Sequence, residues 1–475
     1  MVTRELTPPV EEEAYLSLPG SRARRIGPAR LLSKRGVGNL ILIGWIFWAL
    51  FSLSLFILSG TSQGLLISYF LYLILGAAAL WGARKDILAP MGAFVLVAFS
   101  GFGLNIPLIA TGHVPLIHID DNTLTKVTII ILLAHIGFMC GSLLPNTYFN
   151  PILKIVGTRN STRRTSLAVF FALVFFEIVG GVVRKHLHLG EAGIQPWIPY
   201  GGSGILQFFL YHGVLMFCVW YLVQGLTQNL RHTILGLVLL VGMAITQALL
   251  GWRGGIVAVI IIAIVPFWYQ FKLHDKQKHY SLGWLIVLLC LSYPLIQFGN
   301  TIRAERLGGE HAFAKSTEEF VMNVLTRSQG TTRLAEVTNL FGPLTFTNDF
   351  LIEKLLSKGI TTTTYIDRVV YKIEETQSHG MGTSGPGGPY TALGLSGVFV
   401  SYLLIGILYR LSYFAIINYK STGTNVFGLV WYAFLFLMLF EIINENFSVN
   451  SLKMYFAVLA QLYFFKLLLR TPNSR

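Results

Sequence analysis

Twelve apolar runs, each about 20 residues long, recur along the chain and constrain its fold more than any other feature. A helix of that length crosses the hydrocarbon core of a bilayer. The expected membrane-spanning helices cover residues 39–59, 65–83, 90–112, 126–145, 166–184, 204–224, 233–251, 253–271, 281–299, 389–410, 425–444 and 451–469. Between the seventh and eighth runs only Gly251 and Trp252 form the turn. The sequence therefore predicts an all-α fold, a polytopic bundle of about 12 transmembrane helices.

The composition excludes several classes of protein. Of 475 residues, 53% are hydrophobic and 12% are charged, whereas a soluble domain has about 25% charged residues. A soluble enzyme, a disulfide scaffold and a disordered chain are therefore excluded. The three cysteines lie in apolar runs without a CxxC or Cys/His cluster, so neither a structural disulfide nor a zinc site is expected. The net charge of +14 is better explained by basic cytosolic loops and by contact with anionic lipid or phosphate than by binding to nucleic acid.

The distribution of basic residues predicts the orientation of the chain. Residues 1–38 form a polar, basic stretch beside the first span, and no small-residue cleavage site follows that span. We expect a cytosolic arm that lies on anionic lipid, and no cleavable signal peptide. With this arm inside, 21 Lys and Arg residues fall on the inner side and 5 in the short outer loops and their edges. This bias favours a cytosolic position for both termini.

One long hydrophilic segment, residues 300–388, is placed outside by this topology and carries nearly half of the 22 acidic residues. Helices are expected in it after the capping box of Ser316 and Glu319, over 349–357 and over 361–375. The glycine-rich stretch 379–389 is expected to lie outside any regular element. A loop of this length with its own helices is more typical of a functional cap than of a connection. The predicted parts are a cytosolic basic arm (1–38), spans one to nine (39–299), an extracytoplasmic helical cap (300–388) and spans ten to twelve (389–475).

Five arginines at the predicted outer boundary are the candidate anion-binding residues. Arg253 begins the eighth span between glycines, and the start of a helix presents free N–H groups to an anion. Arg303 and Arg306 follow the ninth span three residues apart, so a helix would place both on one side. Arg327 and Arg333 bracket a short polar stretch. Arginine suits bidentate binding of phosphate, and the alternative role is that of interfacial anchors.

Candidate general bases are fewer. His379 lies at the start of the glycine-rich stretch, and the ordinary pKa of histidine suits proton abstraction from a sugar hydroxyl. Glu305 stands between two of the arginines, and Glu336 and Asp367 are further outer carboxylates. For each of these four residues the alternative is a surface or salt-bridge role.

Other ionisable residues lie outside this group. Asp120 and Asp121 form a second outer carboxylate site after the third span, whereas the first outer loop, near 59–64, contains no acid. Four ionisable residues lie within predicted spans: His135, Glu177, His212 and Glu441. Such residues are candidates for a proton or ion pathway, and the alternative is interhelical hydrogen bonding or a position near the interface.

No Walker loop, GxSxG or HExxH motif is present, and the segments predicted inside are too short to form a nucleotide-sugar domain. Nucleotides and sugar nucleotides are not available on the outer side. An enzyme that faces outward therefore needs a donor that is already activated on a lipid.

The order of these features resembles that of the oligosaccharide repeat-unit polymerases, the Wzy-type O-antigen polymerases. The resemblance rests on the small-Arg-Gly turn at 251–255, the arginine-containing helix around Thr326-Arg327-Ser328 and the glycine-rich segment 382–397 that leads into the tenth span. The long outer loop before the last spans is also similar. The related O-antigen ligases share this layout.

The resemblance implies a glycosyltransferase of the GT-C type in the bacterial inner membrane, with its active site facing the periplasm. Donor and acceptor would be oligosaccharides on undecaprenyl diphosphate, and membrane lipids and a chain-length regulator protein would be its partners, without nucleic acid. The five arginines would stabilise the leaving diphosphate, with His379 or Glu305 as base. Because fixed arginines can replace a metal in this role, no metal and no other cofactor is expected.

A second class of function stays open from the sequence. Twelve spans with intramembrane His and Glu also suit a lipid-linked glycan flippase or another transporter. The long outer loop and the low charge of the spans favour the polymerase. A purely structural membrane protein is the third alternative, and its outer arginines should tolerate alanine.

Overall fold

The protein is helical throughout the part of the chain that the computed structural model describes. That part comprises residues 34–113, 119–145, 214–216, 218–220, 222, 230–249, 253–273, 287, 294, 330–343, 384–417 and 426–444. No β-strand occurs in these residues. The helices are α2 (Lys34–Ser59), α3 (Gln63–Ala83), α4 (Pro90–Ala98), the π-helical turn η1 (Phe99–Gly103), α5 (Asn105–Ala110), α6 (Asp121–Ser142), α10 (Leu230–Leu249), α11 (Arg253–Leu273), α14 (Gly330–Leu340), α16 (Gly387–Ile417) and α17 (Val426–Asn444).

Five segments are long and apolar enough to cross a membrane: Gly36–Ser59, Gln63–Ala83, Pro90–Ala110, Asp121–Ser142 and Gly387–Phe414. Shorter apolar stretches lie within α10, α11 and α17. The all-helical fold and its membrane character agree with the sequence prediction. Eight predicted spans coincide with described helices, including the separation of α10 from α11 at 250–252. The spans at 166–184 and 451–469, and most of those at 204–224 and 281–299, lie outside the described residues, as does the cytosolic arm 1–33.

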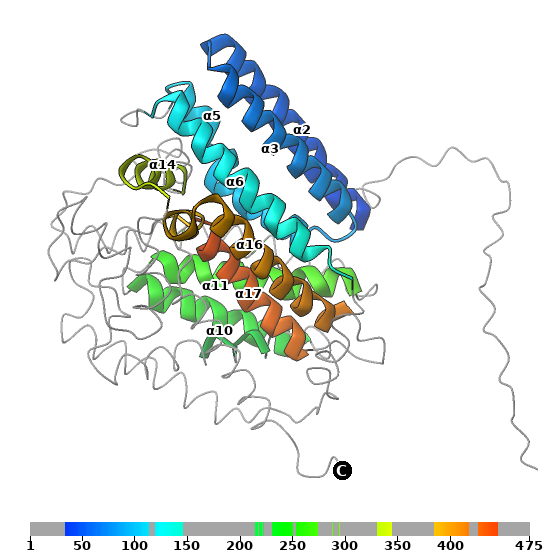
Figure 1. The fold of residues 1–475 in the computed structure, drawn as a ribbon. Helices are drawn as coiled ribbons and strands as arrows, with labels where there is room; N and C mark the ends of the chain where they lie inside the picture. Colours follow the sequence, from blue (N-terminus) through cyan, green and yellow to red (C-terminus); the bar gives the residue numbers. More distant parts are fainter. Residues whose placement is uncertain are drawn as a thin grey trace, which may run out of the picture.

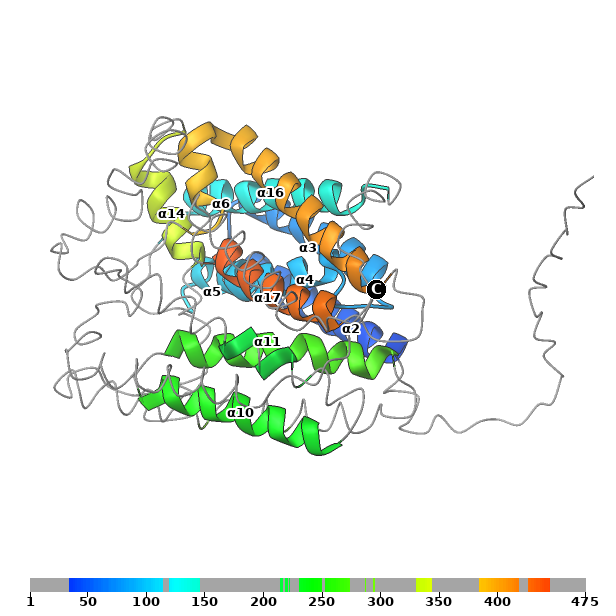
Figure 2. The ribbon, with the colours of Figure 1, turned by 90° about the horizontal axis from the view of Figure 1, so that it is seen from below.

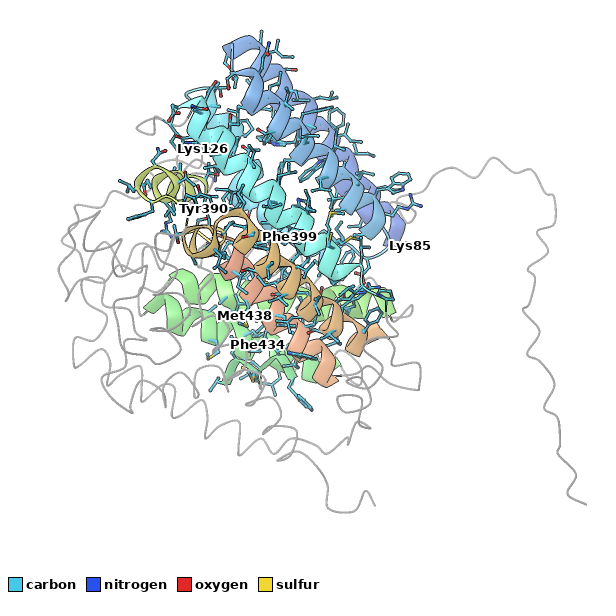
Figure 3. The ribbon with its side chains drawn as sticks, in the orientation of Figure 1. Lys85, Lys126, Tyr390, Phe399, Phe434 and Met438 are labelled. Atoms are coloured by element: carbon cyan, nitrogen blue, oxygen red, sulfur yellow. The ribbon has the colours of Figure 1, made fainter. Side chains whose placement is uncertain are left out.

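The helices pack side by side with their long axes roughly aligned. Figures 1 and 2 show α2 beside α3, α6 beside α16, and α11 between α10 and α17. The short helix α14 lies near the starts of α6 and α16, at one end of the group. Lys126 and Lys85 lie at opposite ends of the N-terminal helices (Figure 3). We call the end with Lys126 the outer end and the end with Lys85 the inner end, following the predicted topology.

Side-chain contacts define the direction of five of these helices. The starts of α3 and α6 lie together at the outer end, because the Asp121 carboxylate accepts a hydrogen bond from the Ser62 backbone N–H at 2.6 Å. At the inner end, Asp86 follows α3 and contacts residues near the ends of α11 and α16. Helix α17 runs the other way, since Tyr432 near its start donates to the Leu88 carbonyl. These directions are the ones that the predicted alternation of spans two, four, eight, ten and eleven requires.

Glycines bring α6 and α16 into close contact. A Cβ atom at Gly137 or Gly141 of α6 would overlap the backbone carbonyl of Phe399 or Leu403 on α16, and a Cβ atom at Gly406 would overlap the Phe138 carbonyl. The spacing of Gly137 and Gly141 is that of the small-xxx-small pattern, which lets membrane helices approach to backbone contact. The two helices run in parallel, and van der Waals contact over this seam joins the N-terminal helices to the C-terminal pair.

The third span is interrupted, in contrast to the single helix predicted over 90–112. The backbone N–H of Leu104 donates to the Phe99 carbonyl at 3.0 Å, which closes a π-helical turn. Pro107 has no N–H to donate to the Gly103 carbonyl. That carbonyl instead accepts hydrogen bonds from the Tyr69 hydroxyl at 2.6 Å and the Trp48 indole at 3.1 Å. Because a bilayer supplies no water to free carbonyls, these side chains make the interruption tolerable.

The glycine seam generates a stability prediction. Gly141→Ala should destabilise the protein by about 1–3 kcal/mol, because the new methyl group has to displace the backbone of α16. Gly44→Ala in α2 is the matched control, since a Cβ atom there meets nothing within 4 Å and alanine favours the helix. The measurement is the free energy of unfolding in mixed micelles under SDS titration. Equal stability of the two variants would contradict close packing of α6 against α16.

Candidate functional site

The outer end of the bundle gathers the described parts of the predicted site. The chain enters α16 there through Ser384, Gly385 and Pro386, and these residues are buried together with the first turn of the helix. The Gly385 N–H donates to the Ile443 carbonyl near the end of α17 at 3.1 Å. Ser384 has a φ of 64°, which is strained for a residue other than glycine. The strained backbone at Ser384 is held by this hydrogen bond and leads into the start of a helix. Strained backbone that is held by its surroundings is typical of functional sites.

The glycine-rich stretch is more regular than the sequence predicted. We expected no regular element over 379–389, but α16 begins at Gly387. Pro389 lies in the first turn of α16. Backbone N–H groups in a first turn have no acceptor within the helix, so the missing N–H of proline costs no hydrogen bond there. The regular helix is then broken at Gly394, whose φ of 66° only glycine adopts without strain. The tenth span therefore begins with a short helical piece, and Tyr390 on this piece lies near α14 (Figure 3).

Helix α14 is an outer element that the sequence did not predict. Its residues Gly330, Thr331, Leu334, Ala335 and Thr338 are buried against the bundle, whereas Glu336 is exposed. The Thr331 hydroxyl donates to the Gly101 carbonyl in η1 at 3.0 Å. The predicted anion-binding residue Arg333 lies on this helix and is half-buried.

Two of the five predicted arginines can be placed at the outer end. Arg253 is the first residue of α11, as predicted. The other end of α11 lies at the inner end, where the rings of Tyr269 and Tyr432 stack edge to face with centroids 6.0 Å apart. The start of α11 therefore points to the same end as α14 and its Arg333. Arg303, Arg306 and Arg327 lie outside the described residues, as do His379, Glu305 and the three other helices predicted in the cap.

The two outer aspartates have structural contacts. Asp120 caps α6: its carboxylate accepts hydrogen bonds from the Thr123 hydroxyl at 2.7 Å and the Thr123 N–H at 3.0 Å. These bonds, the hydroxyl first, lower the pKa of Asp120 below its ordinary value, so it is ionised at neutral pH. The cap also explains why the helix begins at Asp121 and not at 126. Asp121 places a carboxylate against Ser62 in the first outer loop, which has no acid of its own.

The intramembrane residue His135 is fully buried on α6. Its ring lies 5.1 Å from that of Phe94 and 6.0 Å from that of Tyr72, measured between centroids. Neither ring nitrogen has a hydrogen-bond partner, so the interhelical hydrogen bond that we considered for His135 is absent from the described structure. Glu441 belongs to α17, three residues before its outer end. Glu177 and His212 lie outside the described residues.

The inner end is held by a buried carboxylate that the sequence analysis did not single out. Asp86, only 5% exposed, lies in the turn between α3 and α4. It accepts hydrogen bonds from the Trp268 indole at 2.9 Å, the Tyr413 hydroxyl at 2.6 Å and the Tyr269 hydroxyl at 3.3 Å. A buried carboxylate with three donors joins the α3–α4 turn to α11 and α16.

In the described part of the chain, no group of three His, Cys, Asp or Glu residues could hold a metal ion. The chain matched no protein-family model, no curated protein and no solved structure in our comparisons.

The Asp86 cluster generates a second stability prediction. Asp86→Asn replaces one acceptor oxygen by an NH₂ group, so at least one buried donor loses its acceptor, and we expect a loss of about 3 kcal/mol. Asp121→Asn keeps an acceptor for the Ser62 N–H in a less buried place and should lose under about 1 kcal/mol. SDS titration in mixed micelles measures both. An Asp86→Asn protein as stable as the wild type would show that the cluster does not hold the inner end.

Proposed function

We propose that this protein polymerises oligosaccharide repeat units carried on undecaprenyl diphosphate, at the outer face of a bacterial inner membrane. The observation that carries the proposal is the position of three elements at the same, outer end of the bundle. These are the start of α11 at Arg253, the helix α14 with Arg333, and the buried glycine-rich backbone before α16. Together they supply basic side chains and a helix start at the level of lipid headgroups.

The reaction would be a glycosyl transfer. A hydroxyl of the acceptor sugar attacks the anomeric carbon of the donor, the bond to the diphosphate breaks, and undecaprenyl diphosphate leaves. His379 or Glu305 would take the hydroxyl proton. Negative charge grows on the leaving diphosphate, so arginines fixed at that position stabilise the transition state more than the ground state. Arg253 and Arg333 fit this role, and Arg303, Arg306 and Arg327 would complete the clamp.

The proposal includes the finer topology: twelve spans of the GT-C type, both termini in the cytosol, and the segment 300–388 as an extracytoplasmic cap. The directions of the described helices support it. Donor and acceptor glycolipids, membrane lipids and a chain-length regulator protein would be the partners. An O-antigen ligase would use the same donor but a different acceptor, so the acceptor distinguishes the two.

A flippase is the alternative from another class. The interruptions at η1 and at Gly394 favour it, because transporters use broken helices at their substrate sites. Gly394 lies in the outer part of its span, where an outward-facing enzyme also has a use for irregular backbone, whereas η1 lies at the middle of the third span.

The decisive experiment is reconstitution in liposomes with a synthetic lipid-diphosphate repeat unit. We expect a ladder of glycans in the absence of nucleotide and in the presence of chelator, because the donor is already activated and arginines replace a metal. Movement of the lipid between leaflets without any ladder would instead identify a flippase. A single transfer to an added lipid A-type acceptor would identify a ligase.

Variants of Arg253 test the diphosphate clamp. Arg253→Ala should lower polymer formation by about 10²-fold or more, since it removes a donor to the developing charge. Arg253→Lys should be nearly as inactive, because an ammonium group lacks the planar fork that binds a phosphate through two bonds. Initial rates at matched protein levels measure the effect. Full activity of Arg253→Lys, with unchanged affinity for undecaprenyl diphosphate, would show that Arg253 is only an interfacial anchor.

A further inference from the structure

The interrupted third span holds the outer helix α14 in place. The Gly101 carbonyl in the π-helical turn accepts two side-chain hydrogen bonds, from the Asn105 amide at 3.1 Å and from the Thr331 hydroxyl at 3.0 Å. Asn105 belongs to the same span as Gly101, whereas Thr331 lies 230 residues away in the sequence. Gly330 lies against the Phe102 ring, where a side chain would be crowded. The first turn of α14 is thus fixed to the span.

The other end of α14 is fixed independently. The Thr123 hydroxyl shares its one proton between the Asn339 side-chain oxygen, at 2.8 Å, and the Asp120 carboxylate that caps α6, at 2.7 Å. Thr331 and Asn339 are eight residues apart, which corresponds to about 12 Å along a helix. Leu334 and Ala335 are buried between these two contacts. A helix held at both ends cannot shift along or rotate on the bundle without breaking one of the contacts.

Arg333 belongs to this fixed stretch. It lies two residues after Thr331, at the edge of the buried face and next to the exposed face that carries Glu336. Its Cα position is therefore set by the contact between Thr331 and Gly101. A charged group that binds a diphosphate has to be placed within a fraction of an ångström, because small displacements strongly weaken the binding.

We infer that Thr331 is a positioning residue: its hydrogen bond to the π-helical turn of the third span places Arg333 to bind the diphosphate of the glycolipid. The inference rests on the proposed function in its choice of ligand, and it deepens that function by giving the interrupted span a role. The interruption presents a carbonyl oxygen to a side chain of the outer segment, so the span and the cap share one rigid element of the binding site.

Binding of undecaprenyl diphosphate to the full-length protein in nanodiscs tests this inference. Thr331→Val has nearly the shape of threonine but lacks the hydroxyl, and it should weaken binding about tenfold. Thr331→Ser should restore binding. Thr338→Val is the matched control: Thr338 is also buried on α14, but its hydroxyl donates to the Ala335 carbonyl of the same helix. It should bind the diphosphate like the wild type.

The decisive comparison is made in an Arg333→Ala background. If Thr331 acts through Arg333, adding Thr331→Val should cause no further loss of affinity. The same loss in both backgrounds, or no loss in either, overturns the inference. Hydrogen–deuterium exchange of 330–340 should be faster in Thr331→Val and unchanged in Thr338→Val, and unchanged exchange in Thr331→Val would also overturn it.

A second variant and a separate assay keep the outcomes distinct. Should Thr331→Val fail to fold, Asn339→Ala frees the other end of α14 at an exposed position and should weaken binding in the same Arg333-dependent way. Absence of polymer from the wild-type protein would contradict the proposed function alone. The dependence of diphosphate binding on Thr331 and Arg333 would still decide the inference.

Discussion

The contact between α6 and α16 is the interaction on which the rest of the structure depends. Lipid tails are as apolar as leucine, so helices in a bilayer gain little from hydrophobic burial and associate through close van der Waals contact. Gly137 and Gly141 on one helix and Gly406 on the other permit that contact at backbone distance. Helices α2 to α5 are connected to α6 directly or through α3, whereas α17 packs against α16 and α11 packs against α17. Besides the glycine seam, the Asp86 cluster and the hydrogen bond from the Tyr432 hydroxyl to the Leu88 carbonyl join these two groups.

The same solvent explains where polar groups are found. A carbonyl that makes no helical hydrogen bond in a bilayer needs a donor from elsewhere in the protein. Each such carbonyl accepts a hydrogen bond from a particular side chain. The Gly103 carbonyl binds Trp48 and Tyr69, which join the first two spans to the third. The Gly101 carbonyl binds Thr331, which joins the cap to the third span. Irregular backbone therefore determines which distant segments meet.

The sequence predicted what depends on length and apolar composition, and failed where distant partners decide. The spans 65–83 and 425–444 were predicted within two residues, because a long uncharged run has one stable arrangement in a bilayer. The π-helical turn was missed although Pro107 was visible, since a single proline does not reveal which side chains bind the freed carbonyl. Asp86 was missed because its partners lie 182, 183 and 327 residues away. Helix α14 was missed because it is short and has little apolar character of its own.

The predicted site residues show the same difference between local sequence signals and distant contacts. Arg253 could be recognised because glycines and the start of an apolar run mark a helix start locally, and α11 does begin there. Arg333 was chosen for its residue type and its outer position. The helix that carries it is defined by Thr331 and Asn339, whose partners belong to the third and fourth spans. No local pattern relates these residues, so its rigid attachment became apparent only in three dimensions.

The two ends of the bundle differ in a way that bears on function. At the inner end, one buried carboxylate holds three helices through indole and phenol donors, and separating them would leave those groups without partners in a medium of low dielectric constant. A transporter that works by alternating access has to open this end in every cycle and would lose these bonds each time. An enzyme that receives a lipid-linked substrate from the outer leaflet never needs to open it. The fixed inner end therefore supports the proposed outward-facing enzyme over a flippase.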